Sequence, residues 1–292
     1  MSATPAEVAD HHRSTNQLTD NVKYVSITAN RPPLSAELRE FWRYREILYF
    51  LVWRDIKVRY KQTMLGAAWA VLQPLLTMAV FSLFFGKLAG VSSEGLPYPL
   101  FTLAALVPWT LFASGLIQAS NSLVASQDLV KKIYFPRVFV PLASVLSGVV
   151  DFLVASIFLM AMAHWYGMTL RAQLACIAPL TLLTLVAASG AGLMFAALNV
   201  RYRDIQHVIP YLVQIWLFAS PVAYSGHMLP RKWQFVYAIN PMVGVVEGFR
   251  WAILGSPIAL STTSISILAA LIMLTIGIAY FRREESKFAD IV

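Results

Sequence analysis

The chain has 292 residues, of which 58% are hydrophobic and 13% are charged, and its formal net charge is +8. A soluble domain carries roughly 25% charged residues, so this composition argues against a soluble enzyme or binding domain and indicates a membrane protein. The basic residues cluster at the ends of apolar segments, which is the pattern of membrane topology and predicts no nucleic acid partner.

Residues 1–34 are expected to form a loosely ordered cytoplasmic tail. They contain several charges and Pro32-Pro33, and they have no apolar run long enough for a secretory signal. His11 and His12 are interpreted as solvated tail residues, so no metal site is predicted.

Residues 35–62 are predicted to form an amphipathic interface helix with Ser35 as its N-cap. Such a helix lies on the membrane surface, with its apolar side at the headgroup boundary and its basic side chains near lipid phosphates. The apolar stripe consists of Leu38, Trp42, Tyr49, Val52, Ile56 and Tyr60.

Residues 63–292 are predicted to form an all-α polytopic membrane domain with six transmembrane helices. No charged residue occurs between Lys61 and Lys87, which is long enough for a first crossing that contains Gln73-Pro74 as a kink. The predicted spans are about 65–86, 100–123, 138–165, 173–198, 207–224 and 260–281. The fourth span is rich in small residues between 187 and 192, which allow helices to approach closely.

The segment 226–256 is only moderately apolar and contains prolines and charges. It is therefore expected to form two short helices that dip into the outer interface rather than a seventh span. Most Lys and Arg residues flank the predicted spans on the same side as the tail. This distribution places both termini and the loop 124–137 in the cytoplasm.

The sequence contains no phosphate-binding loop, no HExxH, no GxSxG and no pair of cysteines. The chain is therefore not expected to be an enzyme by itself or to hold a cofactor. Asp151 lies midway along the third predicted span, where an isolated charge costs roughly 2.5–3.5 kcal/mol. It is either a proton site or a structural hydrogen-bond partner. No second buried acid or basic residue is expected to accompany Asp151, and this expectation favours the structural role.

The cytoplasmic loop 124–137 is short and amphipathic, and Pro136 lies near its end. Asp128, Lys131 and Lys132 are expected to face water, whereas Leu129, Ile133, Tyr134 and Phe135 offer apolar contact. Composition alone leaves two surfaces open for that apolar side, namely the membrane or a partner protein.

Aromatic residues gather in the first, second and fifth predicted spans. Most aromatic residues of membrane proteins pack or lie at the interface. Rings that face a water-filled lumen would instead give sugars a stacking surface of low specificity, along which a long polymer slides.

Six sequence segments resemble the membrane subunits of polysaccharide-exporting ABC transporters, the Wzm, KpsM and TagG type of O-antigen, capsule and teichoic acid export. The resemblance runs from about residue 40 to the C-terminus, in order and with compatible spacing. The segments are LVWRDIKVRYKQTMLGAAWAVLQPL, LVPWTLFASGL, VKKIYFPRVFVPLA, NVRYRDI, FASPVAYS and YAINPMVGVVEGFRWAILG.

This resemblance implies a homodimer in the bacterial inner membrane with two ATP-binding cassette subunits, which would hold ATP and Mg. The 124–137 loop would be the coupling helix, with Asp128, Lys131, Lys132, Tyr134 and Phe135 as contacts, and 226–256 would be periplasmic gate helices. The lipid pyrophosphate of the glycan would meet the interface helix at Arg54, Lys57, Arg59, Tyr60 and Lys61. Channel rings would be Trp69, Phe84, Tyr211, Trp216 and Phe218.

The resulting hypothesis is an ATP-driven exporter of a lipid-linked polysaccharide, with O-antigen as the first choice. Two alternatives remain at this stage. One is a related exporter of a small hydrophobic molecule, and the other is an ion-driven secondary carrier that uses Asp151.

Overall fold

The computed structural model describes residues 41–61, 68–132, 135–169, 172–285 and 288. Within these ranges all regular elements are helices and no strand occurs. Arg43–Val292 form one compact unit, and Met1–Trp42 form a separate one of which only Phe41 and Trp42 are described. The expected tail, the start of the interface helix and the corner between that helix and the first span lie outside the described residues.

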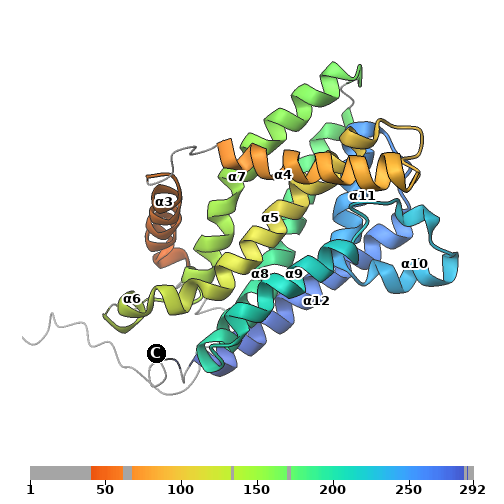
Figure 1. Ribbon diagram of the computed structural model, residues 1–292. Coiled ribbons are helices and arrows are strands. Elements are labelled where there is room, and N and C mark those ends of the chain that lie inside the picture. Colours follow the sequence, from red (N-terminus) through yellow and green to blue (C-terminus); the bar gives the residue numbers. More distant parts are fainter. Residues whose placement is uncertain (1–40, 62–67, 133–134, 170–171, 286–287, 289–292) are drawn as a thin grey trace, which may run out of the picture. The chain divides into compact units, whose positions relative to one another are not determined.

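In the described part of the chain, five helices are long and apolar enough to cross a membrane, and Figure 1 shows how they are arranged. At 1.5 Å per residue, about 20 residues span the roughly 30 Å of hydrocarbon, and these helices have 21 to 30 residues. The first consists of α4 (Ala68–Phe81) and the π-helical η1 (Ser82–Leu88), and the fourth consists of the 3-10 helix η2 (Ala172–Cys176) and α8 (Ile177–Arg201). The other three are α5 (Tyr98–Ala125), α7 (Phe139–Trp165) and α12 (Leu260–Glu285). The protein is therefore an integral membrane protein.

The fifth predicted span forms a shorter helix than expected, α9 (Ile205–Phe218), of 14 residues. A helix of that length rises only about 21 Å. After Phe218 the chain turns through 219–225 instead of continuing as a helix.

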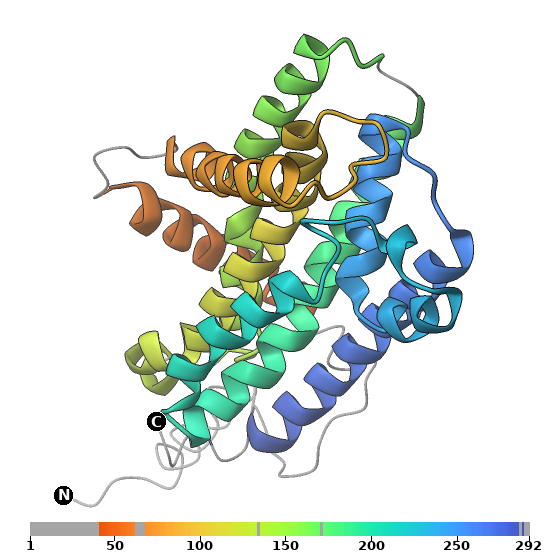
Figure 2. The ribbon, with the colours of Figure 1, turned by 45° about the vertical axis from the view of Figure 1, so that its right-hand side comes forward.

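Helix α5 is the centre of the fold, and 78% of its most apolar stretch is buried. It packs against both α7 and α8, and α8 in turn packs against α12 (Figures 1 and 2). The predicted close approach through small residues is confirmed between α8 and α12. A Cβ added to Gly277 would lie 2.1 Å from the Gly190 carbonyl oxygen.

Polar contacts show which helix ends lie together. At one end, Arg137 Nη1 donates to Glu285 O at 2.8 Å, and Arg201 pairs with Glu284 at 3.8 Å. These contacts join the N-terminal end of α7 to the C-terminal ends of α8 and α12. We call this the basic end. At the opposite end, Tyr98 Oη donates to Ala223 O at 2.6 Å, which joins the start of α5 to the turn after α9.

The segment 226–256 contains the short 3-10 turn η3 (Gly226–Met228) and two short helices, α10 (Arg231–Ala238) and α11 (Pro241–Leu254). Asn240 caps α11 by accepting a hydrogen bond from Met242 N at 3.0 Å, and Gly255 ends it in the left-handed conformation. Two short helices were predicted here. Trp251 is the one residue of α11 that is not buried, so this helix packs within the protein, whereas α10 is largely exposed.

Candidate functional site

The predicted interface helix is described from Arg45 to Lys61 as α3. One side of it packs onto the basic end, where Leu51 belongs to a buried cluster with Phe135, Phe139 and Val140. The opposite side exposes Tyr49 and Trp53, and Phe50 beside them is 74% exposed. The helix thus attaches to the protein along one face and presents aromatic residues on the other.

Helix α3 is also held by polar side chains at its middle. Arg54 donates to Asp55, its neighbour in sequence, at 2.9 Å. Arg54 Nη2 also donates to Ser126 Oγ at 3.4 Å, at the junction of α5 with α6 (Gln127–Lys132). Ser144 Oγ of α7 donates to Asp55 Oδ2 at 3.1 Å.

At its last turn, α3 meets the acid that lies within the third span. Arg59 forms an ion pair with Asp151, and Tyr60 Oη donates to the same carboxylate. Arg59 also donates to Gln118 of α5 and, at 3.0 Å, to Ser147 Oγ of α7. The expectation that no basic residue accompanies Asp151 is therefore wrong. The partner, Arg59, comes from the helix before the first span. Nothing in the sequence of the third span points to that helix.

This arrangement also changes the acidity of the Tyr60 phenol. Partial burial, and then the hydrogen bond to the Asp151 carboxylate, raise the pKa of Tyr60 to about 12. Tyr60 is therefore neutral and donating over the physiological pH range.

Of the five residues predicted to contact lipid pyrophosphate, Lys57 and Lys61 are exposed. Lys57 Nζ lies 5.4 Å from the centroid of the Trp53 ring. Arg54, Arg59 and Tyr60 are partly buried and bonded within the protein. The role of the whole set stays a prediction.

The predicted coupling segment contains α6, in which Asp128, Lys131 and Lys132 are exposed. Tyr134 lies outside the described residues. Phe135 is only 5% exposed and packs in the same cluster as Leu51. The segment therefore buries part of its apolar side against its own chain, which the composition did not indicate.

The predicted ring residues lie on α4, η1 and α9. Four of them are about half exposed or more, namely Trp69, Phe84, Tyr211 and Phe218. The rings of Phe81 and Phe218 are 6.3 Å apart, which brings the end of α4 beside the end of α9. Trp216 differs, because it donates to Asn240 Oδ1 at 2.9 Å and packs edge-on against Phe112.

Trp216 also lines an apolar groove of about 1190 Å³ between α8, α9, α10 and α12. Nearly all of its surface is aliphatic or aromatic. It offers hydrocarbon contact rather than hydrogen bonds to sugar hydroxyls.

Among the residues that the structure describes, Arg250 of α11 is the most deeply buried cation, and it was not singled out from the sequence. It is 3% exposed and donates to the carbonyl oxygens of Phe101, Tyr224 and Val222 at 3.2, 3.2 and 2.8 Å. Burial lowers the pKa of Arg250 to about 9, although the negative charges of Glu247 and Glu94 act to raise it. A signal was present, because Arg250 is the one basic residue between Lys232 and Arg282.

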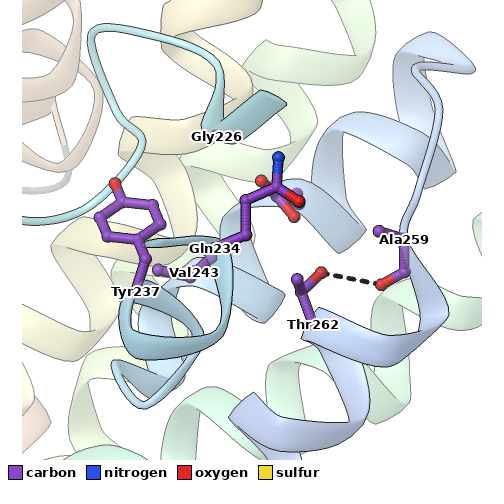
Figure 3. A pocket seen from close by; sticks show the side chains of 7 residues that line it. Gly226, Gln234, Tyr237, Val243, Ala259 and Thr262 are labelled. Carbon is purple, nitrogen blue, oxygen red and sulfur yellow. Dashed lines mark hydrogen bonds between the residues drawn. The ribbon is translucent and has the colours of Figure 1, made fainter. Parts of the chain in front are cut away.

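Beside this cation is a small pocket lined by α10, α11 and the start of α12 (Figure 3). Burial and the hydrogen bond to Tyr224 raise the pKa of Tyr237. The lining residues are Gly226, Gln234, Tyr237, Val243, Glu247, Ala259 and Thr262. In the described part of the chain no group of His, Cys, Asp and Glu could hold a metal ion.

The model of the ABC-2 type transporter family matches residues 46–254. The chain is thus an integral membrane protein that belongs to the ABC-2 type transporter family, which confirms the resemblance seen in its motifs.

Similar proteins include the O-antigen export system permease protein RfbA of Klebsiella pneumoniae, 26% identical over 85% of this chain and 95% of that protein. The RfbA protein of Myxococcus xanthus is 28% identical over 73% of this chain and 82% of its own length. The polysialic acid transport protein KpsM of Escherichia coli is 26% identical over 81% and 93%.

Proposed function

We propose that this chain is the channel-forming membrane subunit of an ATP-driven exporter that moves a lipid-linked polysaccharide, most simply O-antigen, across the bacterial inner membrane. The observation that carries the proposal is the similarity over most of the chain to permeases named for O-antigen export and polysialic acid transport. The lack of a phosphate-binding loop in the sequence fits a subunit that depends on a separate ATPase.

The subunit would cross the membrane six times with both termini in the cytoplasm. The path of α9 supports this count. Its chain leaves the basic end after Arg201 and reaches Ala223 beside Tyr98 at the opposite end. A short helix and a turn would therefore cover the distance that the other spans cover with longer helices. Cations at the basic end suit the cytoplasmic side.

Two copies of this chain would assemble with two ATP-binding cassette subunits, which hold ATP and Mg. The exposed side chains of Asp128, Lys131 and Lys132 on α6 would meet the ATPase subunit. Tyr134 and Phe135 would contribute apolar contact if the segment rearranges on docking. Closure of the ATPase dimer would then push α6 and move the spans as rigid bodies.

The glycan would pass between the two copies, along the exposed rings of Trp69, Phe84, Tyr211 and Phe218. Trp216, which is held by Asn240, would support α9 from behind. Helices α10 and α11 would act as the periplasmic gate.

Lipid pyrophosphate would be attracted to the cations of α3 before the glycan enters the channel. Lys57 and Lys61 are exposed, and the side chain of Arg54 is 39% exposed. Membrane lipids would contact the exposed aromatic face of the same helix.

The proposal is tested in a strain that lacks this gene and whose surface lipid therefore carries no long polysaccharide. Restoring the wild-type gene should return long polysaccharide to the cell surface, as measured by gel electrophoresis of surface glycan. A chain expressed with an ATPase subunit whose Walker lysine is replaced should leave the lipid-linked polymer inside. Export that persists with the inactive ATPase would refute the proposal.

The two alternatives predict different results in the same strain. An exporter of a small hydrophobic molecule would leave surface polysaccharide unchanged after deletion. An ion-driven carrier would stop when a protonophore collapses the proton gradient in vesicles that still contain ATP. Asp151 is paired with Arg59 in the structure, which fits a structural role better than a role as an ion-carrying site.

A further inference from the structure

Two sets of polar contacts attach α3 to the rest of the protein. The first joins Arg54 to Ser126 and Asp55 to Ser144. The second, one turn later, joins Arg59 and Tyr60 to Asp151. Since Ser144 and Asp151 are both on α7, two successive turns of α3 are bound along one side of that helix. A helix held at two levels cannot rotate or slide without breaking one set.

The contact at Asp151 is specific in its charge. An isolated carboxylate within a span is costly, so a cation must accompany it. Arg59 supplies this cation, and its guanidinium also reaches Gln118 of α5 and Ser147 of α7. One side chain therefore ties α3 to both α5 and α7. The side chains of Arg59 and Asp151 are 21% and 28% exposed, so most of the pair is shielded from solvent.

The middle of α3 is connected to α6. Ser126, which accepts from Arg54, is the residue between α5 and α6. Val130 of α6 and Leu51 of α3 lie in one buried cluster. A displacement of α6 would therefore be transmitted to α3 through these direct contacts and not only along the connecting chain.

We propose that Arg59, Tyr60 and Asp151 are positioning residues that make α3 a second coupling arm. This inference rests on the proposed function, in which an ATPase subunit pushes α6. The Arg59–Asp151 attachment keeps α3 in one rigid body with α5 and α7, so motion of α6 reaches the start of α4, which follows α3 in the chain. Without the attachment, ATP hydrolysis continues while α3 no longer moves with α7, and the glycan is not advanced.

The rigid-body claim is tested by spin labels in the complete complex with its ATPase subunits. Labels are placed at the exposed positions Tyr49 on α3 and Trp165 on α7, after Cys176→Ser removes the native cysteine. Complexes with one labelled copy avoid distances between subunits. The distance distribution should stay unchanged when a non-hydrolysable nucleotide is added. A shift in the parent complex would show that α3 moves independently of α7 and would overturn the inference.

Charge reversals give the second arm of the test. R59D and D151R should each broaden the distance distribution and lower the glycan exported per ATP hydrolysed by about tenfold or more. The double variant R59D/D151R should restore both readouts. Glu46→Lys, an exposed charge reversal on the same helix, is the control and should change neither.

The double variant also separates positioning from substrate binding. Restored distances without restored export would mean that Arg59 itself contacts substrate, which contradicts a positioning role. Single variants with unchanged distances and export would contradict the attachment. A parent complex that hydrolyses ATP and moves no glycan would count against the proposed function alone, since the distance measurements need no substrate and still decide the inference.

Discussion

The Arg250 guanidinium carbon lies 3.4 Å from the centroid of the Phe101 ring. The same side chain bonds to three carbonyl oxygens, two of which belong to the turn after α9. A cation over an aromatic ring is stabilised most when it is shielded from water. Arg250 therefore organises the end of the protein opposite the basic end, where α5, α11 and the turn 219–225 meet.

Replacement of this cation by an apolar side chain should destabilise the protein strongly. Arg250→Met leaves buried carbonyl oxygens without donors, at about 1–3 kcal/mol for each such group. We expect the melting temperature in detergent to fall by several degrees or the chain to be degraded. Arg250→Lys should be intermediate, because an ammonium group cannot reproduce the planar set of donors. Lys232→Met, at an exposed position, is the control. Equal melting temperatures of Arg250→Met and Lys232→Met would contradict the stabilising role of Arg250.

The contact of α8 with α12 depends on the missing side chains of two glycines. Gly277→Ala would place a methyl group 2.1 Å from the Gly190 carbonyl oxygen and force the helices apart. Overpacking of this kind costs about 1–3 kcal/mol, and the melting midpoint should fall accordingly. Gly115→Ala on α5 is a matched control, since its new methyl group meets its nearest neighbours at 3.5 Å, an ordinary contact. Equal effects of both substitutions would argue against the close approach.

The attachment of α3 should weaken in strongly alkaline solution. Because the pKa of Tyr60 is raised from 10.0 to about 12 in the folded protein, the folded state holds this proton more tightly than the unfolded state. Its stabilising contribution is complete below pH 10 and is lost as the pH rises through about 12. The difference in melting temperature between wild type and Tyr60→Phe should therefore be constant below pH 10 and change between pH 10 and 12. A difference that is constant over the whole range would refute this dependence.

The spans were largely predictable because hydrophobicity and length are local properties of the sequence. Five of the six predicted segments form long apolar helices, and the small residues of α8 pack where expected. The length of α9 was not predictable in this way. The apolar run continues to Tyr224, but in the structure the helix stops at Phe218 and the turn is held by bonds from distant residues, Tyr98 and Arg250.

The polar partners inside the protein were harder to predict for the same reason. Asp151 and Arg59 are separated by 92 positions, and no pattern in either segment points to the other. Arg250 looked like one charge of a loosely apolar segment, because its binding partners are backbone carbonyls that carry no sequence signal. The resemblance implied that Phe135 contacts the ATPase subunit, and no sequence pattern indicated that it would also pack in a buried cluster with Leu51 of α3.

The exposed lysines of α6 should be needed for attachment to the ATPase subunit. Lys131→Glu with Lys132→Glu reverses two charges at positions that face solvent. We expect the ATPase to be lost on copurification, because like charges across an interface suppress binding. Replacing Lys131, Lys132 and Tyr134 together by alanine, without a reversal of charge, should leave the ATPase bound but uncouple ATP hydrolysis from export. The control is Lys232→Glu near the opposite end, and normal export by the triple variant would rule out the coupling role.

The exposed rings of η1 and α9 should set the rate at which sugar units pass. Phe84→Ala combined with Tyr211→Ala removes two rings that are 54% and 70% exposed, so little folding stability depends on them. Stacking of a nucleic-acid base on an aromatic side chain is worth about 1–3 kcal/mol. We expect the contact of a sugar ring with an aromatic side chain to be weaker than that. We expect surface polysaccharide to appear several-fold more slowly while the amount of protein in the membrane is unchanged. Trp165→Ala, which removes the ring of an 88% exposed tryptophan at the end of α7, is the matched control and should export normally. If both variants slow export equally, the rings act through the membrane interface and not through the glycan.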